Sequence, residues 1–416
     1  MVDLSLEVRR VRNLEEAWRK VRANVLAGGN DQFKSQVKKI EPNVISFLRE
    51  LQKQLKGGYV FSLAIGKLKK KSTGTFRGIV VASVEDRVVQ RALLNILQTE
   101  SQKIAESIGL IPNVIRTTTS IGGTPGAGAQ KGIAMILESI RGGARYYIRS
   151  DIKDFFTKIP KRDVTSFLLR ETKQPEFCKI FENAIDVELQ NKEEIKKYIE
   201  LFPTADTGMP QGSSLSAFAG NVALRSFDVA INQSEVLGLR YVDDFVILAK
   251  SEESAREAYR RGAEELAKLG MTAHDPWAGS REAEAGPTSF DFLGFNIANK
   301  ECAPSADACR NLEGKVKEIL NAGKRSISEM KKNAKGRKKE IGYAQTLNQI
   351  DLTLRGWGDS YNITGNRLRF HQMDKRIDEL LLNFHNWFSV SRKAADSKIN
   401  RRITGVTLLG DIVKPD

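Results

Sequence analysis

Two adjacent acids, Asp243 and Asp244, stand between two apolar runs and constrain this chain more than any other feature. Residues 240–248 read Arg-Tyr-Val-Asp-Asp-Phe-Val-Ile-Leu, which is typical of a β-hairpin with the acids at its tight turn. Neighbouring carboxylates repel each other, and burying both is costly unless a cation neutralises them. Hard oxygen ligands without a nearby Cys or His suit Mg²⁺. An ordinary acidic turn is the more common explanation of an isolated Asp-Asp pair, so other motifs must decide.

Three further stretches favour a catalytic hairpin. Residues 147–156 contain a second short strand that ends in an acid, and residues 208–216 form a Gly/Pro turn before an apolar helix. Residues 290–295 read as a short aromatic strand with a glycine. In this order and spacing the blocks resemble the palm of reverse transcriptases, whose core motif is Tyr-x-Asp-Asp. The resemblance covers roughly residues 60–300.

The resemblance implies a set of catalytic acids. Asp151, Asp243 and Asp244 are the expected catalytic and metal-binding side chains, and the backbone carbonyl of Ile152 is a further expected ligand. Two Mg²⁺ ions, for which Mn²⁺ can substitute, would activate a primer 3′-hydroxyl and stabilise the leaving pyrophosphate. Phosphoryl transfer depends mainly on positioning and charge stabilisation, which such a site would supply.

The resemblance also implies contacts to a dNTP from the fingers and the palm. Arg77 precedes an apolar strand, where the family's fingers grip the incoming nucleotide, and Lys69 lies in the basic run just before it. Phe156 takes the place of the aromatic gate that excludes a ribose 2′-hydroxyl, with core packing as the alternative.

A Gln-Gly-x-x-x-Ser block completes these expected contacts. Gln211 would touch the nucleotide and the template base, and Gly212 would let backbone approach the nucleotide. A helix that starts at Ser213 would offer its N-terminus to negative charge.

Composition indicates a polyanionic partner. The chain has 416 residues, more than a usual single domain, and a formal net charge of +15. Its three cysteines show neither metal-site nor disulfide spacing, and its N-terminus lacks a signal-peptide core. No apolar run is long enough to span a bilayer. These observations predict a protein of the reduced cytoplasm without a membrane partner.

Basic residues predict where nucleic acid binds. Arg87 and Arg91 lie one helical turn apart and could contact template phosphates, or they could pair with the neighbouring acids Glu85 and Asp86. A basic run in the C-terminal part is dense enough to bind phosphates. Its candidate residues are Lys331, Lys332, Lys335, Arg337, Lys338 and Lys339.

The region after the catalytic hairpin matches the family less closely. Phe292, Leu293 and Gly294 resemble its primer-grip strand. The family also carries a lysine after the helix that follows the hairpin, whereas this chain has residues 270–277 there. His274 could act in its place, but a lone histidine is more commonly structural.

The predicted fold is α+β, a right-hand polymerase in three parts. Residues 1–56 form an N-terminal helical extension, residues 57–300 the fingers and palm, and residues 301–416 a basic, maturase-like α-helical thumb. Residues 354–361 resemble the thumb helix of group II intron-type reverse transcriptases.

The predicted function is RNA-directed DNA polymerisation, in which dNMP is added to a primer 3′-end. RNA template, nascent cDNA and dNTPs are the expected partners. The resemblance fits best a stand-alone bacterial enzyme that copies a bound, structured non-coding RNA in antiphage defence. Two alternatives stay open: a maturase-like RNA-binding protein that assists group II intron splicing and retrohoming, and a template-independent or protein-primed DNA polymerase.

Overall fold

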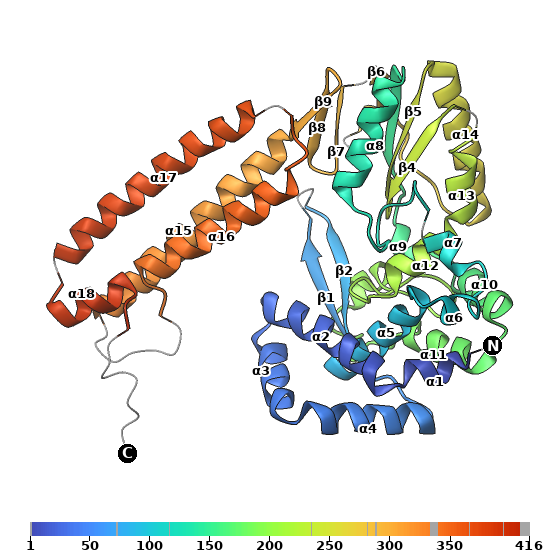
Figure 1. Cartoon of the computed structure of the whole chain (residues 1–416), viewed down its shortest axis with the longest axis horizontal. Coiled ribbons are helices and arrows are strands. Elements are labelled where there is room, and N and C mark those ends of the chain that lie inside the picture. Colours follow the sequence, from blue (N-terminus) through green and yellow to red (C-terminus); the bar gives the residue numbers. More distant parts are fainter. Residues whose placement is uncertain are drawn as a thin grey trace. The chain divides into compact units, whose positions relative to one another are not determined.

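The computed structural model describes residues 2–71, 74–115, 117–233, 235–280, 282–287, 289–332, 340–365, 367–393 and 395–407. The chain forms two compact units (Figure 1). Residues 1–132 and 143–287 make up the first unit, and residues 133–142 and 288–416 make up the second.

Helices open the first unit, as the apolar spacing of residues 1–56 predicts. Leu14, Trp18 and Val21 are buried along one face of α2, which packs against α5 (Val84–Leu97). Their side chains join the same hydrophobic core as the fingers and palm residues, so this extension is an integral part of the unit. The N-terminal helices are α1 (Leu4–Val8), α2 (Val11–Ala27), α3 (Asp31–Ile40), η1 (Glu41–Asn43) and α4 (Val44–Gly57).

A four-stranded antiparallel sheet with the order β4-β5-β3-β6 lies in this unit. Its strands are β3 (Tyr146–Asp151), β4 (Leu237–Tyr241), β5 (Asp244–Ala249) and β6 (Glu284–Pro287). Residues 245–249 of β5 are at most 1% exposed because protein covers both faces of the sheet. α14 (Glu252–Lys268) packs on β3 and β5, and α13 (Arg225–Ala230) lies beside it (Figure 1).

A separate two-stranded hairpin consists of β1 (Ile65–Lys70) and β2 (Phe76–Val81). This hairpin carries the basic residues that the sequence assigns to the fingers. Further helices connect the strands of the first unit: α6 (Gln102–Ala105), α7 (Ile111–Ile115), α9 (Phe155–Lys158), α10 (Lys161–Thr172), α11 (Pro175–Ile185), η2 (Lys196–Leu201) and α12 (Ser216–Ala223).

The second unit begins with a small meander and continues as helices. Leu293 and Gly294 form the two-residue turn between its first two strands, and both have positive φ, as such turns require. Residues 288–300, expected in the palm, therefore group with the helices that follow them. The elements are β7 (Phe290–Phe292), β8 (Phe295–Ala298), β9 (Glu301–Pro304), α15 (Ala306–Lys332), α16 (Tyr343–Ser360), α17 (Leu368–Lys393) and α18 (Ser397–Thr404), with most of α8 (Ala129–Arg141).

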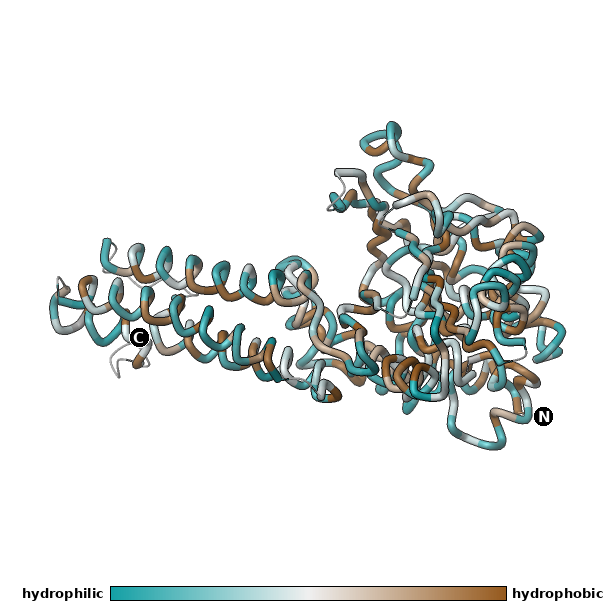
Figure 2. Tube along the Cα trace, turned by 90° about the horizontal axis from the view of Figure 1, so that it is seen from above, coloured by the Kyte–Doolittle hydropathy of each residue, from teal (hydrophilic) through white to brown (hydrophobic). Residues whose placement is uncertain are grey.

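Aromatic packing holds the helices of the second unit together. The Tyr343 ring stacks on Phe388 with centroids 4.2 Å apart, and Trp357 packs 4.7 Å from Tyr361. Trp387, 5.9 Å from Phe384, is part of the same cluster, so core packing accounts for these aromatics. Brown and teal alternate along the helices in Figure 2, as amphipathic packing requires. None of the described helices is long and apolar enough to cross a membrane.

Candidate active site

The predicted catalytic hairpin is formed by β4 and β5. Tyr241 pairs with Asp244 across it. The two-residue turn therefore consists of Val242 and Asp243, and Asp244 begins β5 rather than lying in the turn as expected. Val242 has a φ of +64°, an outlier for a β-branched residue that persists only where the surroundings impose it. The strained residue of this turn, Val242, thus stands directly before the two acids.

The three predicted catalytic acids come together in the first unit. Asp151, the last residue of β3, stands opposite Asp244 in the β3–β5 register. The Ile152 backbone N–H donates to the Asp243 carbonyl oxygen (3.2 Å). Burial, and then the charges of Asp243 and Asp244, raise the pKa of Asp151 to about 7. Burial and the charge of Asp243 raise the pKa of Asp244 to about 6, and burial also raises the pKa of Asp243. Such a cluster favours a bound cation at neutral pH.

A divalent cation fits the chemistry of this site, although the site is not a preformed cage. Asp151 Oδ1 is buried and accepts no hydrogen bond, so a hard acceptor is left uncompensated. In the part of the chain that the structure describes, no three His, Cys, Asp or Glu side chains are placed to hold one metal ion. The expected three-carboxylate cage is therefore not preformed. Mg²⁺ commonly binds through one or two carboxylates and keeps waters and substrate phosphates, a role that suits Asp151 and Asp243.

A pocket beside the acids contains most of the predicted dNTP contacts. Asp151 and Asp243 line it together with Arg77, Phe156 and Gln211. These five side chains come from β2, β3, the β4–β5 turn and the segments that follow β3 and precede α12. Cationic and acidic groups thus face the same small volume, as a metal-bound triphosphate requires.

Lys71, not Lys69, is the lysine that lines this pocket. Lys69 stands opposite Arg77 in the β1–β2 strand register, whereas Lys71 lies just beyond the end of β1. Burial raises the pKa of Asp243, and the positive charges of Arg77 and Lys71 oppose that rise. The geometry therefore favours Lys71 over the predicted Lys69 as the residue that reaches a nucleotide.

The two neighbouring phenylalanines both line this pocket but differ in burial. Phe155 is 2% exposed and packs against Gly220, where an added Cβ would lie 2.7 Å from its ring. Phe156 is half-buried and lines the pocket, and its carbonyl oxygen accepts a hydrogen bond from the Met209 N–H (2.6 Å). Phe155 is therefore a core residue, and Phe156 stands where a gate is predicted.

The Gln211–Gly212 turn connects the pocket to β2. The Val80 N–H donates to the Gln211 carbonyl oxygen (2.8 Å). Gly212 has a φ of +121°, and a Cβ there would lie 2.6 Å from the Val80 carbonyl oxygen. The glycine thus permits the close approach of β2, and its expected approach to the nucleotide stays a prediction. α12 starts at Ser216, so the expected helix N-terminus at Ser213 is not formed.

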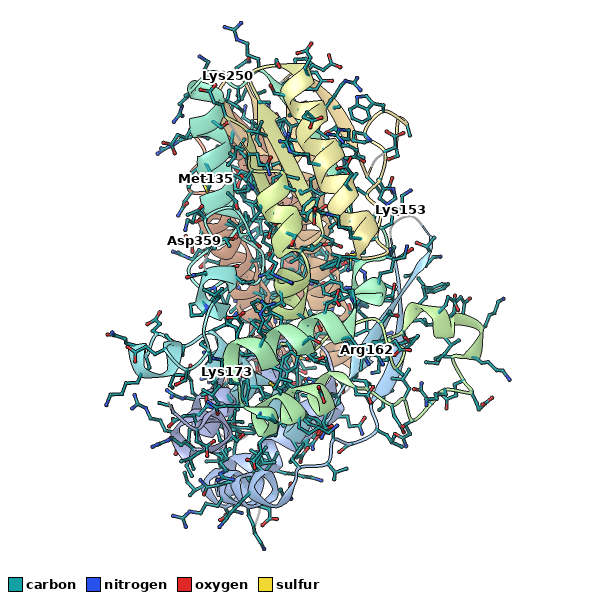
Figure 3. All side chains as sticks on the ribbon, turned by 90° about the vertical axis from the view of Figure 1, so that its right-hand side faces the viewer. Met135, Lys153, Arg162, Lys173, Lys250 and Asp359 are labelled. Atoms are coloured by element: carbon teal, nitrogen blue, oxygen red, sulfur yellow. The ribbon has the colours of Figure 1, made fainter. Side chains whose placement is uncertain are left out.

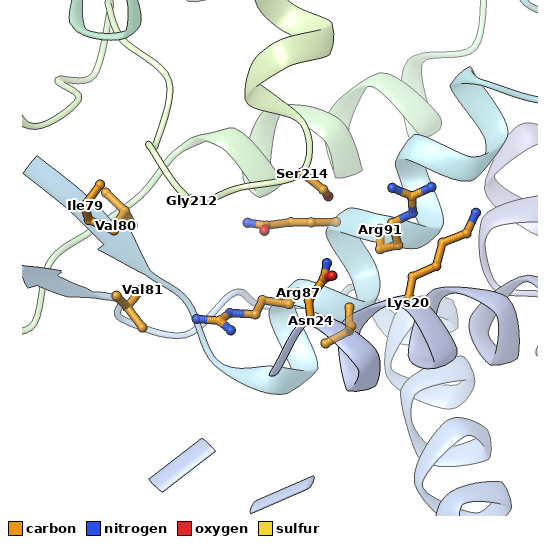
Figure 4. Close-up of a pocket in the computed structure, with 11 residues that line it drawn as sticks. Lys20, Asn24, Ile79, Val80, Val81, Arg87, Arg91, Gly212 and Ser214 are labelled. Atoms are coloured by element: carbon orange, nitrogen blue, oxygen red, sulfur yellow. The ribbon is translucent and has the colours of Figure 1, made fainter. Parts of the chain in front are cut away.

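A second pocket lies next along β2 (Figure 4). The predicted template contacts Arg87 and Arg91 line it, together with Lys20 and Asn24 of α2. Ser214 also lines it, and its hydroxyl is buried without a hydrogen-bond partner. Lys20 and Asn24 were not predicted from the sequence, although their i, i+4 spacing next to the apolar stripe of α2 places both on one face.

The two arginines of this second pocket contact an aromatic ring and an amide rather than an acid. The Arg87 guanidinium lies 4.6 Å from the Phe33 ring, and Arg91 donates to Asn95 (3.0 Å). Burial lowers the pKa of both arginines, and neither forms an ion pair within the described ranges. Their expected alternative partners, Glu85 and Asp86, hydrogen-bond to other residues.

Comparison with known proteins identifies the family. A family model described as reverse transcriptase (RNA-dependent DNA polymerase) matches residues 68–297. The chain belongs to the reverse transcriptase family. That family comprises RNA-directed DNA polymerases, which are nucleotidyltransferases, so the enzyme class predicted from the sequence is confirmed at family level. Right-hand architecture with mixed helix and sheet content agrees with this membership.

Two further comparisons concern curated proteins and solved structures. No curated protein matches the chain. One solved structure among the matches is apo telomerase from Candida tropicalis, truncated from its C-terminal domain. It is 15% identical with a TM-score of 0.36, and the match covers 59% of this chain and 55% of the telomerase. The chain thus spans about half the length of that protein.

Residues 270–277, where the family carries a lysine, are hydrogen-bonded to β3. The His274 N–H donates to the Asp151 carbonyl oxygen (2.9 Å), and the Ser150 hydroxyl donates to the His274 carbonyl oxygen (2.7 Å). Burial, followed by the charge of Lys153, lowers the pKa of His274. Lys153 itself is exposed (Figure 3). These backbone bonds give the segment a structural part in holding Asp151.

Some predicted nucleic-acid contacts lie outside the first unit. Phe292, Leu293 and Gly294 form the β7–β8 turn region of the second unit. Lys331 and Lys332 end α15. The other four candidates of that basic run lie outside the described residues: Lys335, Arg337, Lys338 and Lys339.

Proposed function

We propose that this chain is an RNA-directed DNA polymerase that adds dNMP to a primer 3′-end. The observation that carries the proposal is the surroundings of Asp151. Its buried Oδ1 has no partner, its pKa is raised to about 7 by burial and by two neighbouring acids, and it lines a pocket with Arg77. Membership of the reverse transcriptase family supports the same reaction.

The acids provide the metal-binding side of the site. Asp151 and Asp243 hold the divalent ions, the Ile152 carbonyl is a further ligand, and Asp244 is the third carboxylate. When bound, two Mg²⁺ ions activate the primer 3′-hydroxyl and stabilise charge on the leaving pyrophosphate. The β3–β5 pairing and the bond from Ile152 to the Asp243 carbonyl fix the acids before substrate arrives.

The remaining pocket residues bind the dNTP. Arg77 and Lys71 bind the triphosphate, Gln211 touches the nucleotide, and Gly212 lets that turn dock on β2. Phe156 lies under the sugar and excludes a 2′-hydroxyl. Replacing it by valine should raise ribonucleotide incorporation relative to dNTP by about tenfold or more, since a shape-based pocket discriminates through such contacts. Unchanged discrimination would assign Phe156 to packing.

The template strand follows the second pocket. Arg87 and Arg91 bind its phosphates, with Lys20 from α2 beside them. Lys20 is paired with Glu16 (2.6 Å), so its contribution requires that pair to open. Phe292–Gly294 and the basic run from Lys331 are proposed to contact primer and duplex.

The biological role we favour is that of a group II intron-like enzyme that copies a bound non-coding RNA in bacterial antiphage defence. The likeness of residues 354–361 to group II thumb helices and the net charge of +15 support it. Sequencing of RNA and DNA that co-purify with wild-type and Asp243→Ala protein tests it. One structured RNA in both samples, with complementary DNA only in the wild type, is expected. A broad RNA mixture in both would favour the maturase-like alternative, and DNA covalently joined to the protein would favour protein priming.

Primer extension on an RNA template tests the reaction itself. Asp243→Ala should lower the rate by at least about a hundredfold, because charge stabilisation of this kind contributes several kcal/mol. Asp206→Asn, an exposed carboxyl outside the pocket, is the control and should keep wild-type activity. Primer extension by Asp151→Ala and Asp243→Ala proteins at the wild-type rate would refute the proposed function.

A further inference from the structure

Arg240, in β4, is a fully buried arginine, with 0% of its surface exposed. Its guanidinium forms a two-pronged ion pair with Asp228 of α13. Nε donates to Oδ1 and Nη2 donates to Oδ2, both at 2.6 Å. The Asp228 side chain is itself almost fully buried, so the pair lies inside the protein rather than on its surface.

The other donors of the same guanidinium extend to the catalytic turn. Nη1 donates to the Val242 carbonyl oxygen (2.8 Å) and to Asn221 Oδ1 (3.1 Å). Nη2 also donates to the Ser120 hydroxyl (2.8 Å). Only the planar fork of arginine reaches this many acceptors at once. One side chain therefore links α12, α13, the loop before α8 and the β4–β5 turn that contains Asp243.

The loop before α8 packs closely against the turn and β4. Asn221 Nδ2 donates to the Gly122 carbonyl oxygen (3.1 Å), and a Cβ on Gly122 would overlap the Val242 backbone. The Arg240 N–H donates to the Thr119 carbonyl oxygen (2.8 Å), so the loop also covers the free edge of β4. The positive φ of Val242 is thus imposed from two sides.

We propose that Arg240 is a positioning residue that fixes the Val242 carbonyl and, through it, the direction of the Asp243 carboxylate. A buried ion pair is weak evidence for stability, because apolar residues of similar volume commonly serve as well. What an apolar side chain cannot supply is the donor to the Val242 carbonyl. The inference rests on the proposed function, since it assigns Arg240 a part in placing a metal-binding acid.

The test compares Arg240→Lys with Leu239→Ala. In Arg240→Lys the lysine keeps the charge but cannot bind Asp228 and the Val242 carbonyl together. Leu239→Ala, the control, removes buried apolar volume from the same strand and leaves the Arg240 guanidinium intact. In Arg240→Lys we expect kcat to fall at least tenfold and the Mg²⁺ concentration for half-maximal rate to rise. KM for dNTP should stay within about twofold, because the triphosphate contacts are untouched. Leu239→Ala should shift the unfolding temperature without changing Mg²⁺ dependence.

A second readout separates this inference from the proposed function. Mg²⁺ should raise the unfolding temperature of the wild-type protein by relieving repulsion among the acids, and Arg240→Lys should lose most of that rise. If Mg²⁺ stabilises the wild type but the wild type never extends a primer, the proposed function fails. The role of Arg240 is then still tested by the rise in unfolding temperature that Mg²⁺ causes in the wild type and in Arg240→Lys. Unchanged Mg²⁺ dependence in Arg240→Lys, by both readouts, overturns the inference. If Arg240→Lys does not fold, Asn221→Ala, which keeps the Arg240–Asp228 ion pair, takes its place. We expect Asn221→Ala to raise the Mg²⁺ requirement in the same direction but by less. An unchanged Mg²⁺ requirement in Asn221→Ala would also overturn the inference.

Discussion

Replacing Asp151 by asparagine should stabilise the metal-free protein at neutral and higher pH. An unfolded aspartate ionises near pH 3.8, whereas burial and the charges of Asp243 and Asp244 raise the pKa of folded Asp151 to about 7. Between these values the folded state binds more protons than the unfolded state. The free energy of unfolding therefore falls as pH rises from about 4 to about 7, and the loss is complete above that range.

The magnitude follows from that difference in pKa. A gap of about three pKa units corresponds to about 4 kcal/mol at 1.36 kcal/mol per unit. Coupling to Asp243 and Asp244 shares part of this cost, so about 2–4 kcal/mol is the expected gain for Asp151→Asn at pH 8 in EDTA. At pH 4 the gain should be close to zero, because the carboxyl is then protonated in the folded wild type.

Urea denaturation followed by fluorescence at pH 4 and pH 8, with EDTA and then with Mg²⁺, measures the difference. Mg²⁺ should reverse the order at pH 8, since it stabilises the wild type and not the variant. Asp206→Asn, an exposed carboxyl, controls for loss of one negative charge. An Asp151→Asn protein that is less stable than the wild type at pH 8 in EDTA, or a difference that does not change with pH, would refute the reasoning.

Three further predictions concern the walls of the two pockets. Lys71→Ala should raise KM for dNTP about tenfold by removing a charged contact, whereas Lys69→Ala should change it less than twofold. Steady-state kinetics on one template measures both values, and a larger effect of Lys69→Ala would assign the triphosphate contact to Lys69. Gly212→Ala should cost about 1–3 kcal/mol in unfolding free energy because alanine is strained at a φ of +121° and meets the Val80 carbonyl; equal stability would mean that the turn relaxes. Arg87→Gln should weaken binding of single-stranded RNA and lower the slope of log Kd against log salt by about one, as loss of a phosphate contact requires; an unchanged slope would assign Arg87 to packing on α3.

The clustering of the three predicted acids, Asp151, Asp243 and Asp244, could be expected from the sequence because they lie in strand motifs that resemble those of the family. Once residues 147–151 and 244–249 are assigned to neighbouring antiparallel strands, the alternation of side chains leaves few registers, and the observed one sets Asp151 opposite Asp244. The N-terminal helices were equally accessible, since an apolar period of 3.6 residues identifies them without tertiary information. In each case a local pattern fixes the result.

Features that depend on where a strand or helix ends were less accessible. The sequence shows four lysines between residues 67 and 71, and only the position at which β1 ends decides that Lys71 lines the pocket. Likewise the block at residues 211–216 reads as a helix that begins at Ser213, but α12 starts only at Ser216. Element boundaries respond to tertiary contacts such as the bond between Val80 and Gln211, which no local pattern encodes.

The burial of Arg240 also could not be predicted from local sequence patterns. In the sequence Arg240 is one basic residue near the end of a short apolar stretch, where a solvent-exposed position is the usual expectation. Its burial depends on Asp228 and Asn221, which lie 12 and 19 residues earlier and become neighbours only when α12 and α13 pack beside β4. The acids that line the predicted nucleotide pocket can thus be predicted from a strand motif. The burial of Arg240, which binds the turn beside them, depends on tertiary packing and cannot be predicted from that motif. A variant series confined to the acid motif would therefore miss Arg240, and the Mg²⁺ dependence of Arg240→Lys is the measurement that includes it.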